Sequence, residues 1–353
     1  NLSRGLGDVY KRQEIAWEDN QRTLHNLLDI VQKIAQAAAE LVEVLPEEMQ
    51  DTYGQLADIY RRLSEIHDHL SALVFEPDPD RIYWVEIKPD GRGLALHAAP
   101  LHIGTLMQRH LWHEKDSVIL TSATLTTAGE FDYLRGRLYA EDAYELALGS
   151  PFDYETAALL YIANDLPEPN DRRGHQRDLE RALGRLCRAT GGKTLVLFTS
   201  YAQLRATSKK IAPILAEDDI MVYEQGEGAS PHALLEAFRS AEKAILLGTR
   251  AFWEGVDVPG EALSVLVIVK LPFAVPSDPI VASRGETFED PFYQYQLPEA
   301  ILLFRQGFGR LIRTQSDRGV VVVLDKRILT KQYGRAFTES LPPCTIQLGS
   351  LGE

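Results

Sequence analysis

Short and almost continuously apolar segments recur along the carboxyl-terminal part of this chain, and they constrain its fold more than any other feature. Helical patterns separate most of them. Strands that are apolar on both faces and alternate with helices are typical of a parallel sheet covered by helices on both sides. The sequence therefore predicts an α/β fold, with strands at 157–162, 195–199, 220–223, 245–248, 263–269 and 320–324.

A different pattern occupies the amino-terminal part, where apolar residues recur every three or four positions. One such stripe covers residues 24–45 and a second covers residues 53–73, with Pro46-Glu47-Glu48 between them. Two amphipathic helices joined by a short connection bury their apolar faces against each other. The pattern predicts an antiparallel helical hairpin over residues 14–76.

Pro77-Asp78-Pro79-Asp80 marks a boundary after the hairpin. The next segments predict strands at 82–87 and 94–98, a helix at about 102–113 and a strand at 118–121. The histidines of this region have no cysteine or clear carboxylate partner at ligand spacing, so no metal site is predicted; they are His97, His102, His110 and His113.

Composition narrows the class of protein. With 45% hydrophobic and 25% charged residues, the 353-residue chain is typical of neither a disordered nor a membrane-spanning protein. Cys187 and Cys344 are its only cysteines, too few for a disulfide framework or an iron–sulfur cluster, and we expect a reducing, cytoplasmic location. The net charge of −14 argues against a broad nucleic-acid-binding surface but allows a narrow basic track.

Residues 306–313 carry the clearest chemical signal. In a helix, Gln306, Arg310 and Arg313 stand at i, i+4 and i+7 and share one face. Gly307 and Gly309 cost such a helix about 1 kcal/mol each, which is tolerated where a backbone or ligand approaches closely. Two guanidinium groups there suit a polyphosphate. A solvated arginine pair on an ordinary helix is the alternative.

An acidic loop lies between two predicted strands at residues 249–262. Ligands of parallel sheets bind outside the carboxyl ends of the strands, where this loop begins. Glu254 and Asp257 supply carboxylates that can accept from a ribose hydroxyl or orient the arginines, and Gly255 allows close backbone approach. An ordinary acidic turn is the alternative interpretation.

Four segments together resemble motifs III, IV, V and VI of superfamily 2 helicases in their order and spacing. They are Ser122-Ala-Thr-Leu125, Leu195-Val-Leu-Phe-Thr-Ser-Tyr201, Gly248-Thr-Arg-Ala-Phe-Trp-Glu-Gly-Val-Asp257 and Gln306-Gly-Phe-Gly-Arg-Leu-Ile-Arg313. Phe252-Trp-Glu-Gly-Val-Asp257 and Ser150-Pro-Phe-Asp-Tyr154 are similar to the DinG branch of the XPD-like helicases. The resemblance covers roughly residues 14–345.

The resemblance implies an ATP-dependent DNA helicase that moves 5′ to 3′ on single-stranded or forked DNA in repair or replication. It implies a helical arch at 14–76, part of a first RecA-like domain at 77–150 and a complete second RecA-like domain at 151–353. A monomer with no membrane contact is expected. RNA as the track, and a non-catalytic nucleic-acid-binding module, remain open alternatives.

The resemblance also assigns roles to residues. Arg310 and Arg313 would reach the γ-phosphate of ATP, and Gln306 would orient them or the attacking water. The nucleotide side would include Glu254, Gly255, Asp257 and Gly309. Hydroxyl groups and amides at strand ends suit DNA phosphates, and the expected contacts are Ser122, Thr124, Ser200, Tyr201, Thr249 and Arg250. Phe252 and Trp253 would either stack on bases or pack in the core.

Two family elements have no counterpart in the sequence: a phosphate loop and an Asp-Glu-x-His box. Gly191-Gly-Lys-Thr194 has Cys187 where the first glycine of the loop belongs, and it precedes a strand, so it predicts a turn. In the family, the phosphate loop, the magnesium carboxylates and any iron–sulfur cluster precede the helical insertion. The chain is therefore expected to be the carboxyl-terminal part of a longer protein, with residues 1–13, which resemble a translated adaptor tail, excluded.

A dinucleotide-binding fold is the competing α/β architecture, because it also binds ligands at strand ends. That fold requires Gly-x-Gly-x-x-Gly directly after its first strand. Gly307-x-Gly309 falls in a late helix and ends at Ile312, and Gly226-x-Gly228 runs into Ser230-Pro231. Neither segment fits.

Overall fold

The computed structural model describes residues 15–44, 50–88, 91–127, 129–226, 228–253 and 263–351. The chain divides into two compact units. The first contains Asn1–Met107 and Val275–Pro291, and the second contains Gln108–Ala274 and Phe292–Glu353. The functional division at residues 76 and 150 that the resemblance implies remains a prediction.

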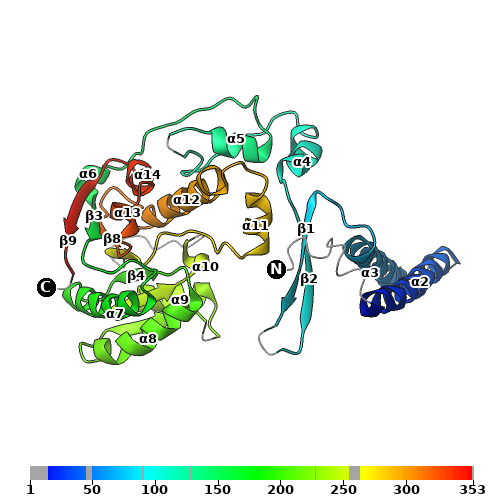
Figure 1. Cartoon of the computed structure of the whole chain (residues 1–353), viewed down its shortest axis with the longest axis horizontal. Helices are drawn as coiled ribbons and strands as arrows, with labels where there is room; N and C mark the ends of the chain where they lie inside the picture. Colours follow the sequence, from blue (N-terminus) through cyan, green and yellow to red (C-terminus); the bar gives the residue numbers. More distant parts are fainter. Residues whose placement is uncertain are drawn as a thin grey trace. The chain divides into compact units, whose positions relative to one another are not determined.

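The first unit contains the predicted helical hairpin, formed by α2 (Ile15–Val44) and α3 (Gln50–Val74). The two helices lie side by side along much of their length (Figure 1). Leu28, Ala35 and Ala38 of α2 and Leu73 of α3 are buried. The apolar periodicity predicted this contact between the helices, but Leu27, Ile34, Leu41 and Ile66 of the predicted stripes are exposed.

A two-stranded antiparallel sheet follows the hairpin, formed by β1 (Arg81–Ile87) and β2 (Leu94–Pro100). α11 (Pro279–Gly285) packs against β1, and Arg284 donates to the carbonyl of Pro100 at 3.1 Å. Both strands confirm the sequence prediction. The helix expected at about 102–113 is present as α4 (Gly104–Met107) and the π-helical turn η2 (Gln108–Trp112).

The second unit is built on a seven-stranded sheet in which every pair of neighbouring strands is parallel. In spatial order the strands are β5 (Met221–Glu224), β6 (Ala244–Gly248), β4 (Thr194–Leu197), β7 (Val265–Ile268), β8 (Gly319–Val323), β3 (Ala158–Ala163) and β9 (Thr345–Gly349). This order confirms the predicted parallel sheet and all six predicted strands. The seventh strand, β9, was not predicted, because its residues are mostly exposed and lack an apolar run.

Helices cover both faces of this sheet, because side chains alternate along each strand. Leu195 and Leu197 of β4 face one apolar core, and Val196 with Phe198 face the other. The first core includes side chains of α9 (Pro231–Ser240), α10 (Arg250–Trp253), α12 (Leu297–Phe308), α13 (Arg327–Thr330) and α14 (Gly334–Glu339). The second core is closed by α7 (Arg172–Ala189) and α8 (Tyr201–Ala216), which lie side by side in Figure 1.

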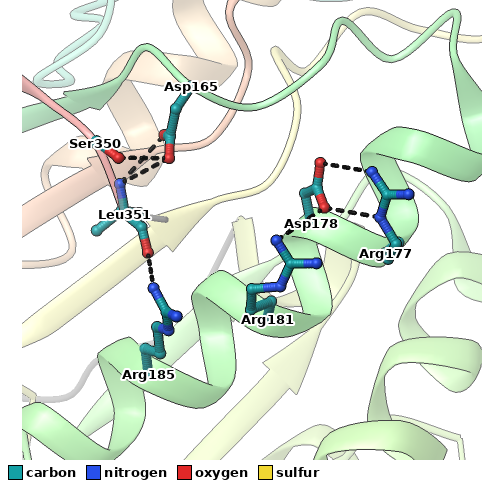
Figure 2. Close-up of polar contacts among 7 residues, drawn as sticks. All are labelled: Asp165, Arg177, Asp178, Arg181, Arg185, Ser350 and Leu351. Carbon is teal, nitrogen blue, oxygen red and sulfur yellow. Dashed lines mark hydrogen bonds and ion pairs between the residues drawn. The ribbon is translucent and has the colours of Figure 1, made fainter. Parts of the chain in front are cut away.

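The edge strand β9 is fixed by polar contacts at its end, which Figure 2 shows. The Asp165 carboxylate accepts from the Ser350 hydroxyl at 2.7 Å and from the Leu351 N–H at 3.1 Å. Arg185 of α7 donates to the Leu351 carbonyl at 3.5 Å. On the same helix, Asp178 stands between Arg177 and Arg181, and the hydrogen bond from Arg177 lowers the pKa of Asp178. These arginines of α7 therefore serve intramolecular contacts.

The strand predicted at 118–121 is wrong. Residues 117–122 have no regular structure, and the side chain of Ile119 is 86% exposed. An apolar run becomes a strand only where a neighbouring strand takes its backbone hydrogen bonds. No strand in the part of the chain described by the structure pairs with this segment. The next helix is α5 (Asp132–Leu138).

Candidate functional site

The arginine segment does not continue as one helix. α12 ends at Phe308 with Gly309 as its C-cap, and the N–H of Arg310 already bonds to the Gly307 carbonyl in a turn. The prediction that Gln306, Arg310 and Arg313 share one helical face is therefore wrong. Only Gln306 lies on the helix; Arg310 lies in the turn and Arg313 in the following loop.

The physical reason is the burial of the next two residues. Leu311 and Ile312 are each 2% exposed, and they belong to the apolar core on one face of the sheet instead of extending the helix. The carboxylate of Asp317 then accepts the backbone N–H groups of Arg313 and Thr314, both at 2.8 Å. These bonds fix the loop that carries Arg313.

Gly307 does have the close neighbour that its cost in a helix predicts. A Cβ atom placed on Gly307 would lie 2.9 Å from the Trp253 ring and 3.4 Å from the Leu197 side chain. The close approach is therefore to a core indole. Around Gly309 the nearest atom to such a Cβ is the Arg305 carbonyl oxygen at 3.4 Å, so no tight approach requires a glycine there.

Arg310 is held by the segment that resembles motif V. Its Nε and Nη2 both donate to the Trp253 carbonyl, at 3.2 and 2.8 Å. Trp253 and Phe252 are themselves buried, and the Trp253 indole donates to the Phe198 carbonyl at 3.2 Å. Of the two interpretations for this aromatic pair, core packing is confirmed.

Three predicted nucleotide-side residues come next in the sequence: Glu254, Gly255 and Asp257. All three lie outside the described residues. The Trp253 carbonyl that holds Arg310 immediately precedes them in the chain.

α12 also holds the segment that resembles motif III. Arg305 donates to the carbonyl and, at 3.0 Å, to the hydroxyl of Thr126, and to the Ala123 carbonyl at 3.3 Å. Gln306 donates from Nε2 to the Thr124 hydroxyl at 3.3 Å. Ser122 is exposed, and its hydroxyl accepts from the Thr124 N–H at 3.2 Å. The structure therefore brings Thr124 and Gln306 together.

Arg305 was missed by the sequence analysis, although it is a third arginine beside the Gln306–Arg313 segment. Burial lowers the pKa of Arg305, which lies in the wall of a pocket of about 670 Å³. The Ser150-Pro-Phe-Asp-Tyr154 segment forms much of the same wall. Burial also raises the pKa of Tyr154. Ala123 also lines the pocket, which therefore joins the motif III-like segment and the Ser150–Tyr154 segment.

The other predicted nucleic-acid contacts meet at the carboxyl ends of β4, β5 and β6. Ser200 caps α8 by accepting from the Gln203 N–H at 3.3 Å. Tyr201 is 38% exposed, and Arg250 is also exposed. Thr249 follows β6 and bonds to Gln225, which follows β5. The predicted residues of motifs IV and V therefore lie at one edge of the sheet, as parallel strands require.

A buried charged cluster lies beyond the ends of β7 and β8. Asp325 is fully buried; it accepts the Leu271 N–H at 2.8 Å and pairs with Arg327 at 2.6 Å. Burial lowers the pKa of Lys270 next to it. The sequence analysis missed this cluster, whose signal is the placement of charged residues directly after two apolar strands.

Neither a candidate metal-binding group nor a membrane-spanning helix is found in the described part of the chain. No group of three or more histidine, cysteine, aspartate or glutamate side chains there could hold a metal ion. Cys187 and Cys344 are both free thiols, and burial raises the pKa of Cys187 to about 12. Among the helices of the described ranges, none has the length and apolar character needed to cross a membrane.

The sequence is similar to those of known helicases. Residues 183–344 match the family described as helicase C-terminal domain. The chain is 35% identical to the 3′-5′ exonuclease DinG of Bacillus subtilis, over 98% of this chain and 39% of that protein. It is 37% identical to the ATP-dependent DNA helicase YoaA of Escherichia coli, over 83% of this chain and 45% of that protein. The chain thus spans less than half the length of these relatives.

The fold has a counterpart among solved structures. An XPD helicase matches 86% of this chain and 56% of its own chain, with a TM-score of 0.58 and 18% sequence identity. At this identity the likeness concerns the fold alone. The parallel sheet with helices on both faces is RecA-like, as the sequence predicted.

Proposed function

We propose that the chain belongs to the DinG branch of the XPD-like helicases and forms the carboxyl-terminal motor portion of an ATP-dependent DNA helicase. One observation supports this most directly. α12 and its terminal turn bond to the motif III-like segment through Arg305 and Gln306, and to the motif V-like segment through Arg310. Because the Trp253 indole also donates to the Phe198 carbonyl, all four helicase-like segments form one connected unit.

Arg310 and Arg313 are proposed to stabilise charge on the transferring phosphoryl group of ATP. Because two nitrogens of Arg310 donate to one carbonyl, the plane of its guanidinium is set before any ligand arrives. Donors fixed in advance stabilise a developing charge without reorganisation during the reaction. The Asp317 carboxylate similarly fixes the backbone at Arg313. Gln306 is proposed to orient these groups or the attacking water.

We propose that ATP and Mg²⁺ are bound mainly by a portion of the intact protein that precedes these residues. The relatives are more than twice as long as the matched region, and the sequence has neither a phosphate loop nor an Asp-Glu-x-His box. No step is therefore assigned to a magnesium ion held by this chain. An iron–sulfur cluster would likewise belong outside this chain, since Cys187 and Cys344 are too few to hold one. Any exonuclease activity of the intact protein is also proposed to lie outside it.

Single-stranded or forked DNA is the proposed track, followed from 5′ to 3′ in repair or replication by a cytoplasmic monomer. Residues 14–76 would form an arch, 77–150 part of the first RecA-like domain and 151–353 the second. The proposed DNA contacts are Ser122, Thr124, Ser200, Tyr201, Thr249 and Arg250, with Thr249 acting through Gln225, to which its hydroxyl is bonded. Glu254, Gly255, Asp257 and Gly309 would lie on the nucleotide side, and Glu254 and Asp257 would couple the nucleotide state to this track.

Substitution of Arg310 by lysine in the complete protein tests the catalytic role. An ammonium is a point charge, so it cannot keep two bonds to the Trp253 carbonyl and also present a planar fork to phosphate. Steady-state ATP turnover is expected to fall roughly 10³-fold, as for other arginine fingers. ATP affinity should change much less, because the other lobe holds the ground-state nucleotide.

Arg239→Lys is the matched control, because Arg239 is an exposed arginine of α9 that pairs with Glu236 at 3.0 Å. Its turnover should equal that of the wild type. Near-normal turnover of Arg310→Lys would contradict the catalytic role and favour a non-catalytic nucleic-acid-binding module.

A further inference from the structure

The orientation of the Gln225 side chain is fixed by its contacts with Thr249. The backbone N–H and the hydroxyl of Thr249 both lie against one terminal atom of Gln225, at 2.7 and 2.8 Å. A backbone N–H can only donate, so this atom must be the carbonyl oxygen Oε1. The Gln225 amide nitrogen, with its two N–H donors, consequently points away from Thr249.

This arrangement changes the role expected of Thr249. The hydroxyl proton of Thr249 is already donated to Gln225, so the hydroxyl cannot donate to a phosphate at the same time. Gln225 is only partly buried, and in the ranges that the structure describes its amide N–H groups meet no acceptor. Gln225 is the residue that presents donors at this edge.

Gln225 stands beside an aromatic and basic group on α8. The next residue, Gly226, has φ +116°, and a Cβ atom there would lie 1.0 Å from the Tyr201 hydroxyl oxygen. The Tyr201 hydroxyl therefore rests against Gly226. The Arg205 guanidinium lies over the Tyr201 ring, 5.1 Å from its centroid. A stacked guanidinium keeps its N–H edges available to an anion.

Charge continues along α8 beyond this group. Lys209 follows Arg205 by four residues, about 6 Å along a helix, on the same face. Both side chains are exposed, and neither forms an ion pair with a described carboxylate. On the neighbouring α7, by contrast, Arg177 and Arg181 pair with Asp178 (Figure 2). Arg205 and Lys209 therefore form a small positively charged strip on a chain whose net charge is −14.

We propose that Gln225 and Arg205 bind the phosphodiester backbone of single-stranded DNA at the ends of β5 and β6, and that Thr249 positions the Gln225 amide. Tyr201 holds Arg205 in place, and Lys209 extends the same track. The inference rests on the proposed function, because it supplies contacts for the strand that a helicase moves along. Amide and guanidinium donors to phosphate read no base sequence.

Binding of a fluorescent oligodeoxythymidylate to the purified full chain, followed by anisotropy, tests the proposal. In Gln225→Glu a carboxylate oxygen still accepts both Thr249 bonds, but the amide donors are lost and a negative charge faces the phosphate. Affinity should fall about tenfold or more. Thr249→Val keeps the backbone N–H bond to Gln225, so affinity should fall by less than about threefold.

Arg205→Gln supplies a second measurement on an exposed side chain whose replacement leaves the core intact. The plot of log affinity against log salt concentration should lose about 0.7 of slope, the value for one phosphate contact on a single strand. Gln347→Glu is the matched control: Gln347 is an exposed residue of β9, at the opposite edge of the sheet. It adds the same charge and should leave the affinity unchanged.

The outcomes separate this proposal from the function on which it rests. A wild-type chain with no affinity for the oligonucleotide would overturn both. Binding by the wild type that Gln225→Glu and Arg205→Gln leave intact would overturn only the phosphate-binding roles of Gln225 and Arg205. A larger loss in Thr249→Val than in Gln225→Glu would identify the Thr249 hydroxyl as the phosphate donor and likewise overturn the inference.

Discussion

At the scale of single residues, Gly307 determines how closely α12 approaches the sheet. In Gly307→Ala the new methyl group would lie 2.9 Å from the Trp253 ring, which is itself fully packed. Overpacking of this kind costs about 1–3 kcal/mol, because neither the ring nor the helix can move freely. We expect the free energy of unfolding, measured with urea, to fall by that amount.

Gly309→Ala is the control for this substitution. Gly309 has φ −66°, and a Cβ there meets its nearest neighbour at 3.4 Å. The free energy of unfolding should change by less than about 0.5 kcal/mol. Equal destabilisation by the two substitutions would contradict the prediction, because helix propensity favours alanine over glycine and only Gly307 has the close Trp253 contact.

Asp317 gives a prediction on pH. Burial opposes its ionisation, but the Thr314 hydroxyl and the N–H groups of Arg313 and Thr314 outweigh this and lower the pKa of Asp317 below its ordinary value of 3.8. A lowered pKa stabilises the fold fully above the ordinary value, and this stabilisation is lost as the pH falls through the folded pKa. Asp317→Asn should therefore be less stable than the wild type at neutral pH.

Urea unfolding of the two proteins from pH 7 to pH 2.5 measures the effect. The difference in free energy of unfolding should be constant above about pH 5 and should shrink below pH 3.8. A difference that stays constant down to the lowest pH would show that the charge of Asp317 does not hold the Arg313 loop.

At the scale of elements, the helical hairpin of α2 and α3 is the part most separable from nucleotide chemistry. Among the described residues of the hairpin, Leu28, Ala35, Ala38 and Leu73 are buried, and they come from the two helices themselves. If the hairpin is an arch over the DNA, deleting residues 20–75 from the complete protein should impair strand separation. ATP affinity should stay nearly unchanged, since the residues proposed to contact nucleotide lie elsewhere. A fluorescence unwinding assay and nucleotide titration measure the two quantities.

The result that would contradict an arch is a parallel loss of both activities. Nucleotide affinity that falls together with unwinding would mean that the hairpin supports the motor itself. The intact protein treated in the same assays provides the reference values.

At the scale of the whole molecule, the purified chain should show no DNA-stimulated ATP hydrolysis. It carries the arginines proposed to act on the γ-phosphate, but its sequence has no phosphate loop and no Asp-Glu-x-His box. Phosphate release with and without single-stranded DNA measures this, with the complete protein as the positive control. DNA-dependent release by the chain alone would show that the described lobe binds and hydrolyses ATP by other residues.

The sequence alone determined the architecture of this protein, because its signals are local. Apolar runs such as 195–199 and 245–248 form buried strands wherever helices cover both faces, and the amphipathic stripes of α2 and α3 require a partner helix. The four helicase-like segments could also be recognised in the sequence, because each is a short continuous motif. The edge strand β9 escaped prediction, because only its neighbour β3 and the contacts of Asp165 make it a strand.

Only the tertiary structure decided which atoms meet. Periodicity placed Arg310 and Arg313 on a helix, but burial of Leu311 and Ile312 ended that helix at Phe308. The apolar segment 118–121 stays unpaired because a strand needs a neighbour, which sequence pattern cannot supply. The bonds of Thr249 to Gln225, and of Arg305 to Thr126, join residues that are 24 and 179 positions apart. Such contacts depend on which distant segments the tertiary fold brings together, and local sequence patterns do not determine this.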